Sequence, residues 1–102
     1  MITVTVSYTV KPEYAAQNKQ NIERFLEDFK QLNTLTFRYH AYQLEDGVSF
    51  RHLAQFPDEA TQKQVLSTPS FKDFQQQRDA SGVGDSQRIE KLQLIGASSD
   101  IF

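Results

Sequence analysis

The stretch LTFRYHAYQLEDGVSFRHLAQF, residues 35–56, decides the fold. It consists of two runs rich in aromatic and aliphatic residues on either side of Asp46-Gly47, a pattern typical of a β-hairpin with a two-residue type I′ turn. A turn at this pair fixes the register of the two strands and places Ala41 opposite His52. Since cross-strand partners share a face of the sheet, one face of the hairpin is predicted to be apolar apart from His52 and its neighbour Tyr39.

The rest of the chain supplies the other elements of an α+β fold. Residues 2–10 alternate between apolar and mostly hydroxyl-bearing side chains, which is the period of a strand with one buried face. A helix is predicted from about Pro12 to Leu32, because apolar residues recur there every three or four positions. Two short helices are predicted within residues 57–79, and a last strand over Gln87–Ala97.

The element order βαββαβ is the ferredoxin-like plan, in which helices cover one face of a four-stranded antiparallel sheet. The length of 102 residues suits one core, so residues 1–102 are predicted to form a single domain. The uncovered face carries Arg38, Tyr42 and Leu53 beside a row of threonines. This mixture is too polar for a dry core and too apolar for an ordinary solvated face, so a homodimer is expected.

Composition excludes several classes of function. The chain has 11 basic and 13 acidic residues, a net charge of -2 that gives no reason to bind nucleic acid or an anionic membrane. No apolar run approaches the roughly 20 residues of a membrane span. There is no cysteine, hence no thiolate nucleophile or cysteine-based zinc site. The N-terminus alternates and lacks the cationic start of a signal peptide, so a cytoplasmic location is expected.

Two segments resemble a known family. LSTPSFKDF, Leu66–Phe74, is similar to the helix-break-helix segment of the antibiotic biosynthesis monooxygenase family, and MITVTVSYTVKPE at the start is similar to its first strand and turn. The element order agrees over essentially the whole chain. The resemblance implies a dimeric α+β barrel, in which two sheets pack face to face and each subunit holds a ligand cavity between its sheet and its helices.

The resemblance also bears on cofactors. Members of the family include cofactor-independent monooxygenases that act on aromatic polyketides or quinols, and heme-degrading enzymes. The heme-degrading branch has Asn, Trp and His where this chain has Val6, Val65 and Gln75. Heme ligation of that kind is therefore not expected, and no other cofactor is predicted.

Tyr39 and His52 are the predicted catalytic residues. They are diagonal neighbours on the helix-facing side of the hairpin, each opposite an alanine that leaves space beside it. A neutral histidine can accept a proton from a phenol, whereas the alternative, which the pattern of a lone histidine in a strand favours, is a purely structural hydrogen bond from His52 to a buried partner such as Tyr39. Arg78 is expected either at the pocket mouth or on a solvated helix end. His40 falls on the opposite face from His52, so no metal site is predicted.

Six phenylalanines on the helices and the hairpin are predicted to bind an aromatic ligand, although their spacing fits core packing as well. They are Phe25, Phe29, Phe37, Phe56, Phe71 and Phe74. Together these residues predict a small cofactor-independent monooxygenase-like protein that acts on an aromatic or quinol-type molecule in a pocket between sheet and helices. A non-catalytic small-molecule binding or sensing module of the same fold is the alternative, and the sequence does not decide whether the protein is an enzyme.

Overall fold

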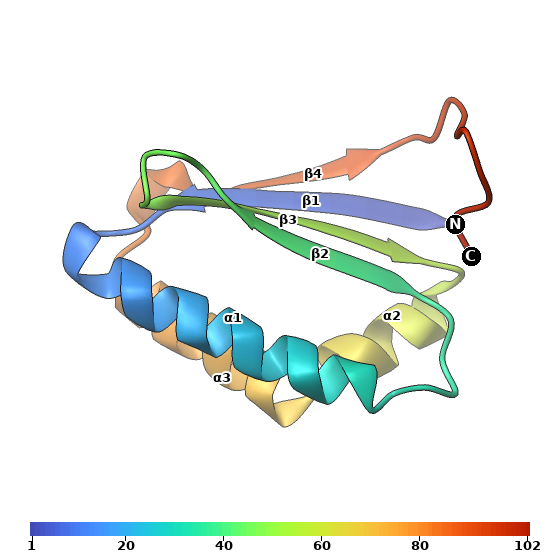
Figure 1. Ribbon diagram of the computed structural model, residues 1–102, viewed down its shortest axis with the longest axis horizontal. Coiled ribbons are helices and arrows are strands. Elements are labelled where there is room, and N and C mark those ends of the chain that lie inside the picture. Colours follow the sequence, from blue (N-terminus) through green and yellow to red (C-terminus); the bar gives the residue numbers. More distant parts are fainter.

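A four-stranded antiparallel sheet packs on a layer of helices in the computed structural model, which describes residues 1–102 (Figure 1). The strands are β1 (Ile2–Thr9), β2 (Arg38–Gln43), β3 (Ser49–Phe56) and β4 (Arg88–Leu92). The helices are α1 (Ala15–Lys30), α2 (Glu59–Leu66) and α3 (Pro69–Ala80), with short 3₁₀ turns η1 (Pro12–Tyr14) and η2 (Gly84–Ser86). The strand order β2-β3-β1-β4 is ferredoxin-like, so the predicted fold class is confirmed.

The β2–β3 hairpin has the register that the sequence predicted. Ala41 pairs with His52, and Tyr39 pairs with Ala54. Because side chains alternate along a strand, this register turns every second residue of β3 toward the helices, and each of these is buried.

The turn that joins β2 to β3 differs from the predicted type I′ turn. Gly47 has a φ of 76°, but Asp46 has no positive φ, which a type I′ turn requires at both central positions. Instead, the Asp46 carboxylate accepts hydrogen bonds from Val48 N at 2.9 Å and from Ser49 N at 2.8 Å. These bonds satisfy backbone groups that follow the turn, and they leave the strand register unchanged.

The core between sheet and helices is dominated by aromatic rings. The buried apolar side chains of the two long helices are Ile22, Phe25, Phe29, Phe71 and Phe74. They meet Tyr8, Phe50 and Phe56 from the central strands. None of the helices is long and apolar enough to cross a membrane.

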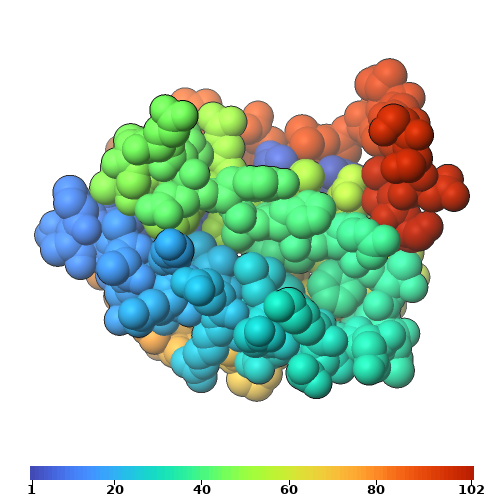
Figure 2. All heavy atoms as spheres, in the orientation of Figure 1, coloured from blue at the N-terminus to red at the C-terminus, as the bar shows by residue number.

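The last strand is shorter than predicted. A strand over Gln87–Ala97 was expected, but its pairing with β1 ends where Leu92 lies opposite Thr3. Because β1 begins only one residue before Thr3, it has almost no backbone left to pair with the residues that follow Leu92. Residues 93–102 form neither helix nor strand, and Figure 2 shows them standing out from the body of the protein.

Candidate functional site

His52 lies in the middle of β3, on the sheet face that the helices cover, and its side chain is buried. Its Nδ1 is 2.7 Å from Tyr39 Oη, and its Nε2 is 2.8 Å from Tyr8 Oη. The hairpin register predicted Tyr39 as a neighbour of His52, and the structure brings the two side chains into contact. Both ring nitrogens have a partner, as a buried neutral imidazole requires.

Tyr8 is a site residue that the sequence reasoning missed. The alternation of residues 2–10 includes Tyr8 among the apolar positions, but it does not connect this residue with His52. In the sheet, Val6 lies directly opposite His52, so Tyr8 is a diagonal neighbour on the same face. The sequence contained enough information to link Tyr8 with His52, because the ferredoxin-like plan places the first strand beside the third.

Asn18 of α1 extends this set of contacts across the core. Its Nδ2 donates a hydrogen bond to Tyr8 Oη at 3.0 Å, and the side chain is fully buried. Its Oδ1 has no hydrogen-bond partner. We refer to Asn18, Tyr8, His52 and Tyr39 as the buried polar chain.

Arg78 is the one charged residue that is buried among these aromatic rings. Its guanidinium lies over the ring of Tyr8, at 5.4 Å from the centroid, and over that of Phe74, at 5.2 Å. Only 6% of the residue is exposed, which excludes the solvated helix end, one of the two expected positions. Its Nε and Nη2 donate to the Asp79 carboxylate at the surface. Arg78 therefore brings a positive charge close to the buried polar chain.

Burial keeps the titratable groups of the buried polar chain uncharged. Burial, with a smaller contribution from the Arg78 charge, lowers the pKa of His52 from 6.5 to about 3. Burial raises the pKa of Tyr8 to about 12, against the opposing effect of the Asn18 hydrogen bond. Burial also raises the pKa of Tyr39, and the neighbouring Tyr8 adds to this effect. His52 is consequently neutral at physiological pH, and so are both tyrosines.

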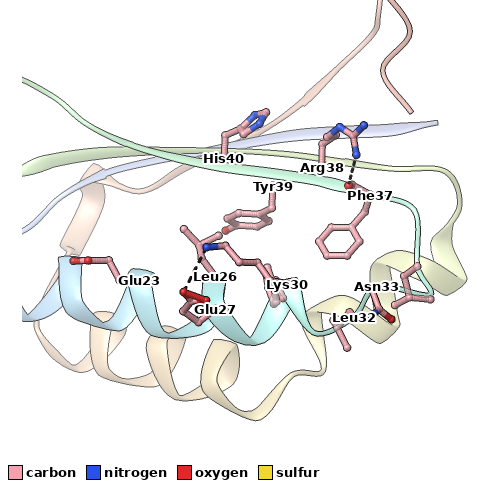
Figure 3. Close-up of a pocket in the computed structure, with 12 residues that line it drawn as sticks. Glu23, Leu26, Glu27, Lys30, Leu32, Asn33, Phe37, Arg38, Tyr39 and His40 are labelled. Atoms are coloured by element: carbon pink, nitrogen blue, oxygen red, sulfur yellow. Dashed lines mark hydrogen bonds and ion pairs between the residues drawn. The ribbon is translucent and has the colours of Figure 1, made fainter.

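A groove of about 620 Å³ runs between α1 and β2 at the edge of the sheet (Figure 3). Its apolar wall is made of Leu26, Phe29, Leu32, Leu35, Phe37 and Tyr39. Charged side chains, including Glu23, Lys30 and Arg38, complete the lining. Tyr39 is the one member of the buried polar chain that lines this groove, so its ring connects the surface with His52.

The six phenylalanines predicted to bind a ligand divide into two groups. Phe29 and Phe37 line the groove, whereas Phe25, Phe56, Phe71 and Phe74 do not. The latter four are packed in the core, with exposed fractions of 0–5%. The Phe25 ring packs against Tyr39 and His52, at centroid distances of 5.4 and 6.2 Å. Ligand binding by these side chains stays a prediction.

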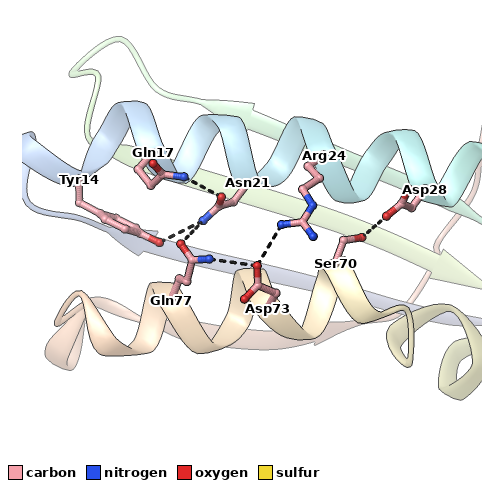
Figure 4. Close-up of polar contacts among 8 residues, drawn as sticks. All are labelled: Tyr14, Gln17, Asn21, Arg24, Asp28, Ser70, Asp73 and Gln77. Atoms are coloured by element: carbon pink, nitrogen blue, oxygen red, sulfur yellow. Dashed lines mark hydrogen bonds and ion pairs between the residues drawn. The ribbon is translucent and has the colours of Figure 1, made fainter.

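The groove wall formed by α1 is fixed to α3 by polar contacts (Figure 4). Asn21 Nδ2 donates to Gln77 Oε1 at 3.0 Å, and Gln77 Nε2 donates to Asp73 Oδ2 at 3.0 Å. Arg24 donates to the same Asp73 oxygen at 3.1 Å. Most of these groups are partly exposed, so they add little stability, and their main effect is to set the position of α1 against α3.

His40 lies on β2, on the opposite face of the sheet from His52, as predicted. The structure has no group of three or more His, Asp or Glu side chains arranged to hold a metal ion. The predictions of no metal and no cofactor are not tested by this finding.

The model of the antibiotic biosynthesis monooxygenase family matches residues 1–77, which include the first three strands, α1, α2 and most of α3. The chain belongs to this family. No curated protein sequence matches it significantly.

Several solved structures share the fold of this antibiotic biosynthesis monooxygenase family member. One antibiotic biosynthesis monooxygenase is 18% identical, with a TM-score of 0.79 over 94% of this chain and 100% of its own. Rv0793 from Mycobacterium tuberculosis is 11% identical, with a TM-score of 0.77 over 96% and 98%. SnoaB, a cofactor-independent oxygenase from Streptomyces nogalater, is 16% identical, with a TM-score of 0.70 over 97% of each chain. At these identities the likeness establishes the fold alone.

Proposed function

We propose that the protein is a small cofactor-independent monooxygenase-like enzyme whose substrate is an aromatic or quinol-type molecule bound between α1 and β2. The observation that carries this proposal is Tyr39, which lines the groove and is hydrogen-bonded to the buried His52. Family membership and the fold shared with a cofactor-independent oxygenase support it. The groove has the size and the largely apolar wall of a small-molecule site.

A quinol can supply both electron pairs that such a reaction needs. Oxidation of a quinol ring by O2 places one oxygen atom on a ring carbon and releases the other in water, while the ring becomes a hydroxyquinone. The groups near Tyr39 have to favour the electron-rich anion of the substrate, which reacts with O2. The substrate loses its proton to water, and a hydrogen bond from Tyr39 to the resulting oxygen anion stabilises it, while His52 orients the Tyr39 hydroxyl.

The burial of His52 limits what this residue can do. A group with a pKa near 3 takes up a proton from a phenol poorly at neutral pH, so orientation of Tyr39 fits His52 better than the role of a general base. The same observation supports the alternative function, a non-catalytic binding or sensing module that holds the ligand in the same groove without turnover.

Oxygen uptake tests the proposal. An oxygen electrode should record consumption when the protein is mixed with a panel of quinols and polyphenols. Tyr39→Phe removes the hydroxyl but keeps the ring that lines the groove, and it should lower the rate by about tenfold or more, the effect of one lost hydrogen bond in the transition state. Tyr42→Phe is the matched control, because Tyr42 is exposed on the opposite sheet face. Saturable binding without oxygen uptake would favour the binding module, and absence of both would contradict the two functions.

We also propose that the protein is a homodimer formed through the uncovered sheet face, as the family resemblance implies. Tyr42 and Leu92 are about half exposed on this face, beside the small side chains of Thr5 and Ser7. Aromatic side chains such as that of Tyr42 are enriched in interfaces between subunits.

The introduction of a charge on this face tests the dimer. Light scattering after size-exclusion chromatography should give twice the chain mass at micromolar concentration, and Leu92→Glu should shift the protein toward monomer by burying a charge in the interface. Ile89→Glu is the matched control, since Ile89 is exposed on β4 but faces the other side of the sheet. A wild-type monomer, or equal effects of the two substitutions, would contradict the proposal.

A further inference from the structure

The hydrogen bonds of the buried polar chain run in one direction in the structure. Asn18 Nδ2 donates to Tyr8 Oη, so the Tyr8 hydroxyl is free to donate to His52 Nε2. A neutral imidazole has one N–H and one acceptor nitrogen. If Nε2 accepts, Nδ1 carries the hydrogen and donates to Tyr39 Oη. The Tyr39 hydroxyl then has its own hydrogen left to donate to a molecule in the groove.

The unpaired oxygen of Asn18 permits the opposite direction. Rotation of the buried amide by half a turn places Oδ1, which has no partner, where Nδ2 now meets Tyr8 Oη. Tyr8 then donates to Asn18, His52 Nε2 donates to Tyr8, and Tyr39 donates to His52 Nδ1. Each arrangement leaves one side of the amide unpaired, and both contain the same number of hydrogens. Neither arrangement therefore brings a net charge into the core.

We propose that the buried polar chain reverses its hydrogen-bond direction with the ligand, so that Tyr39 accepts a hydrogen bond from a neutral quinol and donates one to the quinol anion or to the corresponding quinone. Tyr39 is suited to this role because it alone among the four residues lines the groove. Asn18 and Tyr8 act as positioning residues, since they do not touch the ligand and affect it only through His52 and Tyr39. This inference rests on the proposed function and specifies that the same site recognises both redox forms of its ligand.

The neighbourhood of His52 favours reversal over protonation as the response to a ligand. The Arg78 guanidinium lies over the Tyr8 ring, and a second positive charge on His52 would be repelled by it. The other rings that face His52 belong to Phe25 and Phe74, which offer no counter-charge. A change in the tautomer of His52 adapts the hydrogen bonds to the ligand without adding charge to the core.

The tautomer of His52 can be read directly by ¹⁵N NMR, in which a protonated and an unprotonated ring nitrogen have well-separated shifts. The probes are 1,4-naphthoquinone, which only accepts hydrogen bonds, and 1,4-naphthohydroquinone under nitrogen. We expect the hydrogen on Nδ1 in the free protein and in the quinone complex, and on Nε2 in the quinol complex. Binding of both probes with one unchanged tautomer would overturn the inference and leave the proposed ligand site standing. Binding of neither probe would overturn both.

Asn18→Leu provides a second test that does not depend on the spectrum. Without the amide, His52 Nε2 is the only acceptor left for the Tyr8 hydrogen, so Tyr8 has to donate to His52 and Tyr39 is held as a donor. Affinity for the quinol should fall roughly tenfold relative to that for the quinone, the effect of one lost hydrogen bond. Asn21→Leu, which changes another buried asparagine of α1 outside the chain, should leave the ratio of affinities unchanged. An unchanged ratio in Asn18→Leu would overturn the inference.

Discussion

Phe25→Ala is expected to lower the free energy of unfolding by about 3–5 kcal/mol. The Phe25 ring is completely buried and lies between the sheet and α3. It packs against Phe29, Phe71 and Phe74 at centroid distances of 5.1, 5.0 and 4.9 Å. Because rings from both helices and from the hairpin meet this side chain, its removal leaves a cavity that no single neighbour can fill.

Urea unfolding followed by circular dichroism measures this loss. Phe102→Ala makes the same chemical change in the C-terminal tail, where the side chain is 40% exposed, and is expected to cost less than about 1 kcal/mol. In a thermal scan, Phe25→Ala should lower the melting temperature by more than about 12 °C. Equal effects of the two substitutions would mean that Phe25 is not central to the core.

The hairpin register could be predicted because it depends on local information. A turn at Asp46-Gly47 and strict alternation on either side of it determine which residues face the helices, and the error in turn type did not affect the register. The end of β4 was misjudged for the opposite reason. The length of an edge strand depends on where its partner ends, and the apolar residues after Leu92 fit a strand pattern equally well.

The candidate site was only partly predictable. Tyr39 and His52 come from one hairpin, so a register sufficed to bring them together. Asn18 and Arg78 come from different helices, and their contacts with Tyr8 depend on how α1 and α3 rotate on the sheet. The sequence pattern around Arg78 gave no reason to bury a charge, because the favourable aromatic surface is created by the fold.

The location of the groove depends on side-chain packing in the same way. Ala41 and Ala54 indicated space beside Tyr39 and His52, but the Phe25 ring packs there against both residues. The groove opens instead where Phe37 and the residues that follow α1 leave the edge of β2 uncovered.

The second large effect expected is a loss of stability on acidification that depends on His52. In the unfolded chain His52 takes up a proton below pH 6.5, whereas in the folded protein it does so only near pH 3. Between these values the unfolded state binds one more proton than the folded state. Stability is therefore fully present above pH 6.5 and falls as the pH is lowered, by about 1.4 kcal/mol per pH unit.

This slope can be separated from other acid effects by its pH range. The lowered pKa values of the Asp46 and Asp58 carboxyls also contribute stability that is lost on acidification, but only as the pH falls through and below their usual value of 3.8. The range from pH 6.5 to about 4.5 thus reports mainly on His52. Across it, the wild-type protein should lose about 2–3 kcal/mol in urea unfolding.

His52→Gln replaces the imidazole with a neutral amide that can still hydrogen-bond to Tyr8 and Tyr39. It should destabilise the protein at pH 7 but remove most of the slope between pH 6.5 and 4.5, since no group at this position then titrates. His40→Gln, on the exposed face of β2, is the control and should keep the wild-type slope. If His52→Gln kept the full dependence of stability on pH between 6.5 and 4.5, a group other than His52 would be taking up the proton. It would then remove the main argument that His52 stays neutral between its two tyrosines, and a protonated His52 that donates from both ring nitrogens could not support reversal of the buried polar chain.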